Sequence, residues 1–266
     1  MKARPERDGD VTRLRMISAS GRAARIGVST YVVRGVMIDS GFPRARAAIL
    51  EAVASLRVHG VIVTHWHEDH AGNVPLLARR RVPISMRGET EATLRARPEI
   101  ELYRRLVWGR PSKLDVDVTP FDAPGFRCIH TPGHSPDHQV VWDAQTGTLF
   151  SGDLWLGIRA RVLHSSEDPY VIVDSLRRAA SLAPDRMFDA HRGRVDQPVK
   201  ALLARAEWLS ATIGEIERRI AEGWTDSEIL KRVLAGEELA GFLSYGGYAR
   251  RNLARAVRRR VAASHR

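Results

Sequence analysis

The sequence predicts a mixed α/β domain over residues 11–198, followed by a helical C-terminal extension. Short apolar, β-branched runs such as Val36–Ile38 and Val61–Thr64 are typical of buried strands. Apolar residues at helical spacing fill residues 44–56 between these runs, which completes a strand–helix–strand unit. The composition then shifts to helix formers, so we expect residues 199–266 to form the helical extension.

The composition indicates a chain with a sizeable core and without a membrane span. The 266 residues are 44% hydrophobic, and no apolar run approaches the roughly eighteen residues that a membrane helix needs. Residues 1–10 are charged and lack the apolar stretch of a secretory signal, so we expect a flexible tail there. The single cysteine excludes an intrachain disulfide, which suits a reducing cytoplasm and equally a secreted protein that needs no such bond. Without a signal, we expect a cytoplasmic protein.

The formal net charge of +11 has two interpretations. It indicates an acidic partner such as RNA or an anionic small substrate, or it reflects an arginine-rich composition that fills solvated faces. The second interpretation is favoured because the excess is spread along the chain. The last predicted helix carries six arginines and no acid among them, namely Arg250, Arg251, Arg255, Arg258, Arg259 and Arg260. This helix is a solvated face, a dimer contact, or a contact for RNA or an acyl carrier.

The remaining elements follow from the same two periodicities. We expect strands over 11–17, 29–33, 82–86, 116–121, 126–129, 139–142, 148–151 and 186–189. We expect helices over 71–80, 89–108, 168–183, 199–222, 226–235 and 248–262. Pro98 should break the second of these helices, and Asp168 should cap the third, with Pro169 at its first position.

The stretch His65–His70 concentrates three imidazoles and two carboxylates in six consecutive residues after a predicted strand. Imidazole and carboxylate are ligands for zinc, iron and manganese. His65 and His67 can point to one side while Asp69 and His70 turn to the other, so two metal ions can lie side by side. A solvated polar turn is the alternative interpretation, which would suit a lone histidine better than this cluster.

Three further motifs place a candidate ligand directly after a β-rich run, so that all can meet at one edge of a sandwich. They are Thr131–Ser135 with His134, Phe150–Asp153 with Asp153, and Phe188–His191 with His191. Together with His65–His70 and the following Ala71-Gly72, they resemble the signature of the metallo-β-lactamase superfamily, in the family's order, over residues 11 to 195. The last motif departs from the family pattern, since Ala190 and Arg192 replace the usual flanking glycines.

The resemblance implies an αββα sandwich, two mixed sheets between helices, with a binuclear metal site. It implies that His65, His67 and His134 bind one ion, that Asp69, His70 and His191 bind the second, and that Asp153 bridges them. The cofactors would be two divalent ions, with zinc first and iron or manganese as alternatives. Such a pair holds a hydroxide nucleophile, and Asp69 would orient it and carry a proton to the leaving group.

The resemblance also suggests roles for residues near these ligands. Asp39 lies where the superfamily often has an aspartate that supports the metal loop, although a turn-forming Asp before Gly41 is equally expected. Tyr170 lies where some lactonase and thioesterase relatives have a substrate-facing tyrosine. We expect Cys128 to be a buried, inert thiol, and His164 to lie at a pocket rim or on the surface.

Three functions remain open. The first is a glyoxalase II-like hydrolase of a small thioester, ester or lactone, which the compact length favours. The second is a metal-dependent ribonuclease or phosphodiesterase of the same fold, whose basic tail would hold phosphates. The third is a metal- or partner-binding module without catalysis. We expect a small-molecule substrate as the main partner, RNA as the alternative, no membrane, and a homodimer as compatible with the helical tail.

Overall fold

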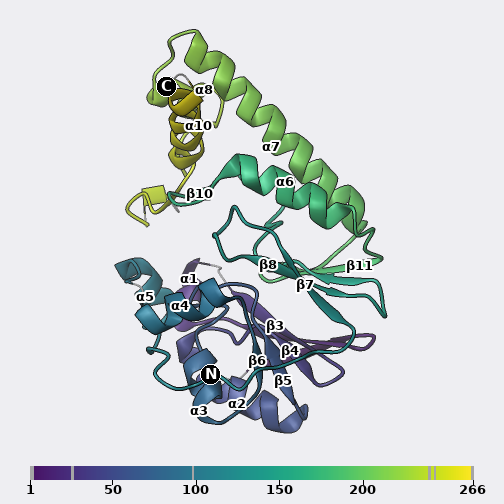
Figure 1. Cartoon of the computed structure of the whole chain (residues 1–266). Helices are drawn as coiled ribbons and strands as arrows, with labels where there is room; N and C mark the ends of the chain where they lie inside the picture. The colour runs from purple at the N-terminus through teal and green to yellow at the C-terminus, as the bar shows by residue number, and fades with distance from the viewer. Residues whose placement is uncertain (1–2, 25–26, 98, 239–240, 243, 265–266) are drawn as a thin grey trace. The chain divides into compact units, whose positions relative to one another are not determined.

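A computed structural model describes residues 3–24, 27–97, 99–238, 241–242 and 244–264, and the internal contacts divide the chain into two compact units (Figure 1). Unit 1 comprises residues 1–130, 137–153 and 184–196, and unit 2 comprises residues 131–136, 154–183 and 197–266. The helical extension expected over 199–266 lies in unit 2, together with two earlier segments of the chain. Because the units alternate along the sequence, a domain boundary at residue 198 stays a prediction.

The first sheet of unit 1 has six strands in sequence order. They are β1 (Arg4–Asp8), β2 (Val11–Met16), β3 (Val28–Val33), β4 (Val36–Ile38), β5 (Gly60–Ile62) and β6 (Ile84–Ser85). The first four pair antiparallel, whereas β4, β5 and β6 run parallel. Parallel strands end at the same edge of a sheet, so the loops after β4 and β5 begin side by side.

The expected flexible tail is wrong for residues 4–8, because β1 pairs with β2 along its whole length, and residues 1–2 lie outside the described residues. The strand side chains are largely exposed, so no apolar alternation marks the strand in the sequence. Ion pairs of Asp8 with Arg194 at 2.7 Å and of Asp10 with Arg186 at 2.8 Å tie this region to residues far along the chain. Because these contacts are non-local, the sequence around residues 1–10 does not indicate them.

The second sheet of unit 1 has five strands in the order β12, β11, β9, β8, β7. Their bounds are β7 (Phe126–His130), β8 (Gln139–Asp143), β9 (Thr148–Phe150), β11 (Arg186–Asp189) and β12 (Gly193–Val195). Only β9 and β11 are parallel among these pairs, so the loops after both strands begin at one edge. These loops carry Asp153 and His191.

Apolar residues of both sheets share one core in unit 1. Tyr31 of β3 is the centre of this core, with its ring 5.5 Å from Phe150 and 5.3 Å from Phe188 of the second sheet. Ile38 and Ile62 extend the same cluster at the ends of β4 and β5. The strands therefore reach the metal-loop edge as rigid, buried elements. Two mixed sheets and helices confirm the predicted α/β class.

Helices cover the other face of the first sheet, as Figure 1 shows for α2 and α3. Their bounds are α1 (Ala19–Ala24), the 3₁₀ turn η1 (Pro43–Ala45), α2 (Arg46–Ser55), α3 (Val74–Arg79), α4 (Gly88–Ala96) and α5 (Leu102–Trp108). The expected helix over 89–108 is thus two helices, and Pro98 lies outside the described residues. The predicted strand over 116–121 is wrong, since that segment contributes only an isolated bridge from Pro120 to Ile84.

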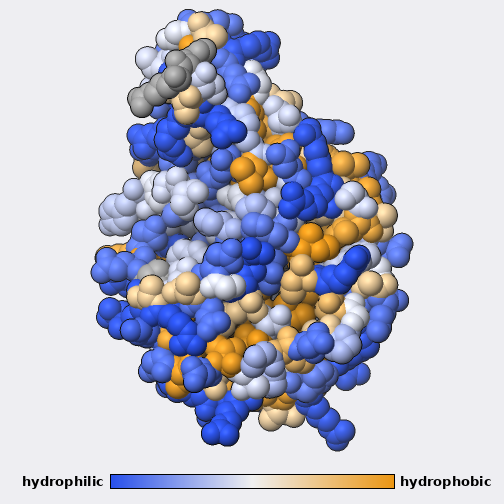
Figure 2. Space-filling model, viewed as in Figure 1, coloured by the Kyte–Doolittle hydropathy of each residue, from blue (hydrophilic) through white to orange (hydrophobic). Residues whose placement is uncertain are grey.

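Unit 2 is mainly helical. It contains α6 (Pro169–Ala180), α7 (Pro198–Ala221), α8 (Asp226–Arg232), α10 (Arg251–Ser264) and the short strands β10 (Leu163–His164) and β13 (Tyr248–Ala249). The predicted cap of α6 is confirmed, because the Asp168 carboxylate accepts hydrogen bonds from the amides of Tyr170 and Val171. Among the described residues, no helix combines the length and apolarity needed to cross a membrane. Hydrophilic residues cover much of the face in Figure 2, with separate apolar patches between them.

Candidate metal centre

The metal-loop cluster lies at the edge where the parallel strands end. Asp39 directly follows β4, and the loop from Val63 to His70 follows β5. Asp153 and His191 follow the parallel pair β9 and β11 in the other sheet. Two sheets, each with a parallel pair, thus bring these ionisable side chains together from four separate segments of the chain.

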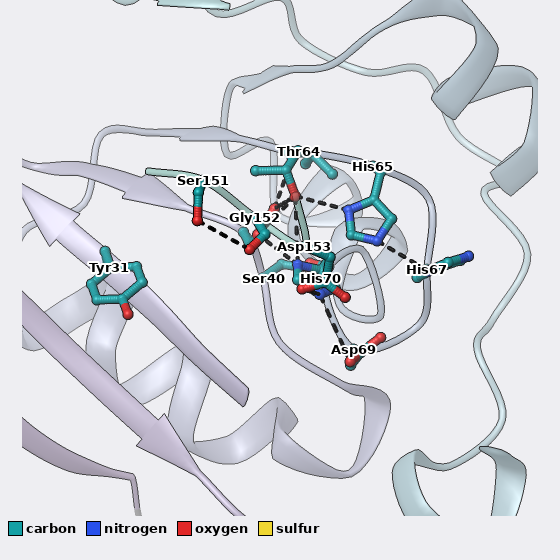
Figure 3. Close-up of polar contacts among 12 residues, drawn as sticks. Tyr31, Ser40, Thr64, His65, His67, Asp69, His70, Ser151, Gly152 and Asp153 are labelled. Atoms are coloured by element: carbon teal, nitrogen blue, oxygen red, sulfur yellow. Dashed lines mark hydrogen bonds and ion pairs between the residues drawn. The ribbon is translucent and has the colours of Figure 1, made fainter. Parts of the chain in front are cut away.

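Asp69, His70, Asp153 and His191 form one cluster within unit 1, and their ligand atoms all lie within 4.8 Å of one another. Oδ1 of Asp153 lies 3.2 Å from Nε2 of His70 and 3.1 Å from Nε2 of His191. Oδ2 of Asp69 lies 3.7 Å from Nε2 of His70 and 3.8 Å from Nε2 of His191. Figure 3 shows Asp153 and His70 next to one another, with a dashed line from this pair to Asp69. The Asp153 carboxylate thus lies between two imidazoles, and all three groups could bind one cation.

The second nitrogen of each imidazole is fixed by the protein. Nδ1 of His70 lies 2.8 Å from Oδ2 of Asp39, and Nδ1 of His191 lies 2.7 Å from the carbonyl oxygen of Gly27. Both partners are acceptors, so each Nδ1 donates its proton, and in the neutral imidazole each Nε2 is left to present a lone pair to the cluster. Such anchoring is typical of metal-binding histidines. Asp39 therefore makes the contact with this loop that the resemblance suggests, and its role at a metal ion stays a prediction.

One buried atom shows that the cluster fits a metal ion. Among the described residues, Nε2 of His70 is fully buried and makes no hydrogen bond of good geometry, although Oδ1 of Asp153 lies 3.2 Å away. Buried nitrogens and oxygens without a partner cost free energy, and a bound cation would satisfy this one. The donor set of two imidazoles and two carboxylates suits a borderline divalent ion.

The charges in the cluster favour a cation. Burial lowers the pKa of His191, but the carboxylates of Asp153, Asp69 and Asp189 together outweigh burial and raise the pKa to about 10. Burial likewise opposes protonation of His70, yet Asp153, Asp69 and Asp39 raise its pKa well above the usual value. Conversely, His191 and His70 overcome the effect of burial and hold the pKa of Asp153 well below its usual range. The carboxylates thus attract positive charge, which protons supply when no metal is bound.

His65 and His67 form a second pair of candidate ligands in unit 1. Nε2 of His65 lies 3.0 Å from Nδ1 of His67, and Oγ1 of Thr64 lies 3.0 Å from the other nitrogen of His65 (Figure 3). Two nitrogens on one tetrahedral zinc ion, with bonds of about 2.0–2.1 Å, lie roughly 3.3 Å apart. The pair therefore has nearly the spacing that a shared ion requires.

His134 belongs to unit 2, in the loop over residues 131–136. Its Nδ1 lies 2.8 Å from a carboxylate oxygen of Glu167, and both side chains are buried. This carboxylate lies within ion-pair distance of the imidazole and can restrict its orientation. Gly133 has a φ of +124°, and an added Cβ would lie 2.6 Å from the backbone nitrogen of Ile172, so only glycine fits before His134.

The loop that carries the ligands is held by buried polar contacts. Oδ1 of Asp39 accepts hydrogen bonds from the amide and hydroxyl of Thr64, and Oδ2 of Asp137 accepts from the amide of Trp66. Gly72 leaves no room for a side chain, because an added Cβ would lie 2.2 Å from the carbonyl oxygen of Glu68. The glycine after the motif is therefore required by a close backbone approach.

Sequence reasoning missed three residues that support the site. Asp137 holds the metal loop, His138 accepts a hydrogen bond from the amide of Asp153 at 3.1 Å, and Glu167 fixes His134. The available signal was the polar pair Asp137-His138 immediately before an apolar strand, where buried polar residues need a reason.

Several other expectations need correction or stay open. Cys128 is exposed on β7 and not buried as expected. His164 is buried in β10, where its ring lies 5.0 Å from that of Tyr248, so it is not a surface residue. The hydroxyl of Tyr170 donates a hydrogen bond to Glu217 at 2.7 Å, and its role in substrate binding stays a prediction.

Comparisons with known proteins agree with this geometry. A family model described as the metallo-beta-lactamase superfamily matches residues 24–197. The chain is 31% identical over 187 residues to the Beta-lactamase-like protein 2 homolog of Drosophila melanogaster, which covers 65% of this chain and 61% of that protein. It is 32% identical over 167 residues to an atrochrysone carboxyl ACP thioesterase of Aspergillus fumigatus, covering 59% of this chain and 48% of that one. The chain thus spans less than two thirds of each relative's length.

A solved metallo-beta-lactamase from Pseudomonas aeruginosa in a mono-zinc form has a similar fold, with a TM-score of 0.60 and 14% identity over 78% of this chain and 96% of that one. At this identity the likeness shows the fold alone. The family model, however, covers well over half of the sequence. The chain therefore belongs to the metallo-beta-lactamase superfamily.

Proposed function

We propose that this chain is a metal-dependent hydrolase that cleaves a thioester, an ester or a lactone. The observation that carries the proposal is the position of Asp153, whose carboxylate oxygen lies 3.2 Å from His70 and 3.1 Å from His191. This carboxylate comes from one sheet and His70 from the other, so the fold itself assembles the cluster.

We propose two divalent ions, with zinc as the first choice. Asp69, His70 and His191 would hold one ion, His65, His67 and His134 would hold the other, and Asp153 would bridge them. When bound, such ions supply a hydroxide at neutral pH and polarise the scissile carbonyl, which lets the reaction proceed without a serine or cysteine nucleophile.

The chain's own residues supply orientation and proton transfer. Oδ2 of Asp69 lies 3.7–3.8 Å from two imidazoles, close enough to orient a nucleophile in the cluster and then hold its proton for the leaving group. Asp39 and the carbonyl of Gly27 keep His70 and His191 in the tautomer that accepts at Nε2. Burial of Asp69, His70 and Asp153 keeps most bulk water away from them and strengthens these interactions.

Two observations favour an acyl substrate. One relative at 32% identity is named a carboxyl ACP thioesterase, so thioester chemistry occurs among similar proteins. In unit 1, α5 exposes Leu102 and Leu106, which lie one helical turn apart and are 62% and 55% exposed. The helix α5 contacts the metal loop through Arg104. Its two exposed leucines therefore offer an apolar surface that suits the acyl part of a substrate.

The test combines metal content with a substrate panel. The purified, metal-loaded protein is assayed with a glutathione thioester, a homoserine lactone, a phosphodiester and a β-lactam. We expect turnover of the thioester or the lactone that follows metal content, and we expect Asp153→Ala to abolish turnover and tight metal binding together. An Asp153→Ala protein that retains both would refute the proposal. Asp143→Ala is the matched control, because that buried carboxylate pairs with Arg34 and not with the cluster.

A second candidate function, a metal-dependent ribonuclease or phosphodiesterase, is favoured by one surface of unit 1. A groove of about 550 Å³ carries four arginines and no acidic residue among its lining side chains, the arginines being Arg44, Arg46, Arg79 and Arg110. The arginine-rich C-terminal helix supports it less, since Arg251 pairs with Glu237 and Arg258 with Asp226. RNA binding that weakens steeply with salt, together with phosphodiester turnover, would favour this function.

A binding module without catalysis is the third alternative. Stoichiometric metal without turnover of any panel substrate would favour it. A cytoplasmic location and a homodimer through the helical tail stay proposals, which fractionation and light scattering would test.

A further inference from the structure

Glu68 is the one acid of the metal loop that turns away from the candidate ligands. It lies between His67 and Asp69 in sequence, and its carboxylate is 1% exposed. Arg104 of α5 binds this carboxylate in a bidentate manner, with Nε 2.7 Å from Oε1 and Nη2 2.5 Å from Oε2. The arginine side chain is itself only 5% exposed.

We propose that Arg104 is a positioning residue for the metal centre, because it keeps Glu68 out of the ligand set and fixes the backbone between His67 and Asp69. This inference rests on the metal site proposed above. A carboxylate is as good a ligand for a divalent ion as the aspartates of the cluster. A glutamate at this place in the loop therefore competes for metal unless another group holds it.

Among the described residues, Arg104 is the residue that binds the Glu68 carboxylate in a bidentate manner, and the space beside that carboxylate is small. The cavity next to it, lined also by Trp66, Arg97 and Ser112, has a volume of only about 10 Å³. A cavity needs roughly 10–15 Å³ to hold one water molecule, so this cavity has room for one water molecule at most beside the carboxylate. Without Arg104, Glu68 must take up a proton, disturb the loop, or turn towards a cation.

Arg104 also joins α5 to the loop. Its guanidinium lies 5.6 Å from the ring centroid of Trp66, and Nη1 lies 3.6 Å from Glu101 at the start of the helix. The arginine thus contacts two residues of the metal loop and one of its own helix. Both the direction of Glu68 and the position of α5 depend on the same side chain.

The experiment measures cobalt(II) binding, by chelator competition and by the absorption spectrum of the bound ion, together with thermal unfolding of the metal-free protein. Arg104→Met removes the pair, and Glu68→Gln combined with Arg104→Met removes both charges. Arg34→Met is the matched control, since Arg34 makes a bidentate pair with Asp143 at 2.9 and 2.8 Å and also stacks over an aromatic ring. Neither partner of that control pair belongs to the metal loop.

We expect Arg104→Met to weaken cobalt binding about 10–100-fold, the usual effect of losing a partner that orients ligands, and to change the spectrum of the bound ion. The double variant should recover most of the affinity and the wild-type spectrum, because the neutral amide no longer competes. The control should lose thermal stability without losing affinity. If Arg104→Met does not fold, Arg104→Lys retains the charge but not the bidentate geometry, and it should show a smaller loss.

Wild-type affinity and spectrum in Arg104→Met, or in Arg104→Lys where that variant replaces it, would overturn the inference. An affinity that falls only in step with thermal stability, with no recovery in the double variant, would overturn it as well. These outcomes leave cobalt binding by the wild-type protein intact. They therefore differ from a failure of the proposed function, in which the wild-type protein itself binds no ion.

Discussion

Substituting Asp39 by asparagine replaces one carboxylate oxygen by an amide nitrogen. We expect this change to lower metal affinity more than it lowers the stability of the fold. The carboxylate has two tasks, since Oδ1 accepts from the amide of Thr64 at 2.7 Å and Oδ2 accepts from Nδ1 of His70 at 2.8 Å. An asparagine can keep the first contact through its carbonyl oxygen. Its amide nitrogen then faces His70, and a nitrogen that donates cannot accept the proton of Nδ1.

The size of the effect follows from the tautomer of His70. To accept a hydrogen bond at Nδ1, the imidazole must carry its proton on Nε2, the atom that faces Asp153 at 3.2 Å. A protonated Nε2 cannot bind a metal ion. We therefore expect affinity for the ion bound by His70 to fall about 10–100-fold, or about 1.4–2.8 kcal/mol. Rotating the asparagine side-chain amide by 180° does not restore binding, because its NH₂ group then faces the backbone N–H of Thr64, and both groups are donors.

The assay is competition for zinc with a chromogenic chelator, run beside thermal unfolding of the metal-free protein. The isosteric change retains the Thr64 contacts, so unfolding should shift less than metal affinity. Asp143→Asn is the control, because its carboxylate is buried in unit 1 but pairs with Arg34, outside the cluster. Wild-type zinc affinity in Asp39→Asn would refute the tautomer argument, and an equal loss in the control would show a general effect of removing a buried charge.

Three further predictions use other parts of the structure. In a denaturant titration, Gly72→Ala should lower the free energy of unfolding by about 3 kcal/mol, since its Cβ would lie 2.2 Å from a backbone oxygen. In the same titration, Gly214→Ala should raise it by about 0.5–1 kcal/mol, because the added Cβ meets nothing within 4 Å. The raised pKa of His191, about 10, means that its stabilising charge is fully present below pH 6.5 and is lost as the pH rises to 10. The melting temperature of the metal-free protein should fall over that window, and a flat profile would contradict this. Glu167→Gln should weaken zinc binding about 10-fold through the imidazole of His134, as measured by chelator competition, and unchanged affinity would argue against this anchor.

The candidate ligand residues could be identified from the sequence because each belongs to a short local motif. His65–His70 lies in one loop after one strand, and Asp153 and His191 end short motifs of their own. The α/β class followed from apolar periodicity, which also located α6 and its cap Asp168. The order of the motifs along the chain then suggested which of them meet.

The supporting contacts could not be predicted, because they depend on how distant segments pack. Glu68 and Arg104 are 36 residues apart, and nothing in either neighbourhood indicates that they form a buried pair. Asp137 holds Trp66 from 71 residues away, and Glu167 reaches His134 from another loop. The prediction of a flexible tail at the N-terminus was wrong for the same reason. The exposed strand β1 has no apolar pattern in the sequence, and it is held in the sheet by its pairing with β2.

The most direct test of the central claim is the metal content per chain, measured by elemental analysis after reconstitution with zinc and removal of free ions. The account predicts about two ions per wild-type chain and none firmly bound to the Asp153→Ala protein, with thioester or lactone turnover present only in the first. No stoichiometric metal in the wild-type protein after reconstitution with zinc, iron or manganese would contradict the account. The clusters would then be polar contacts within the fold and not a metal centre.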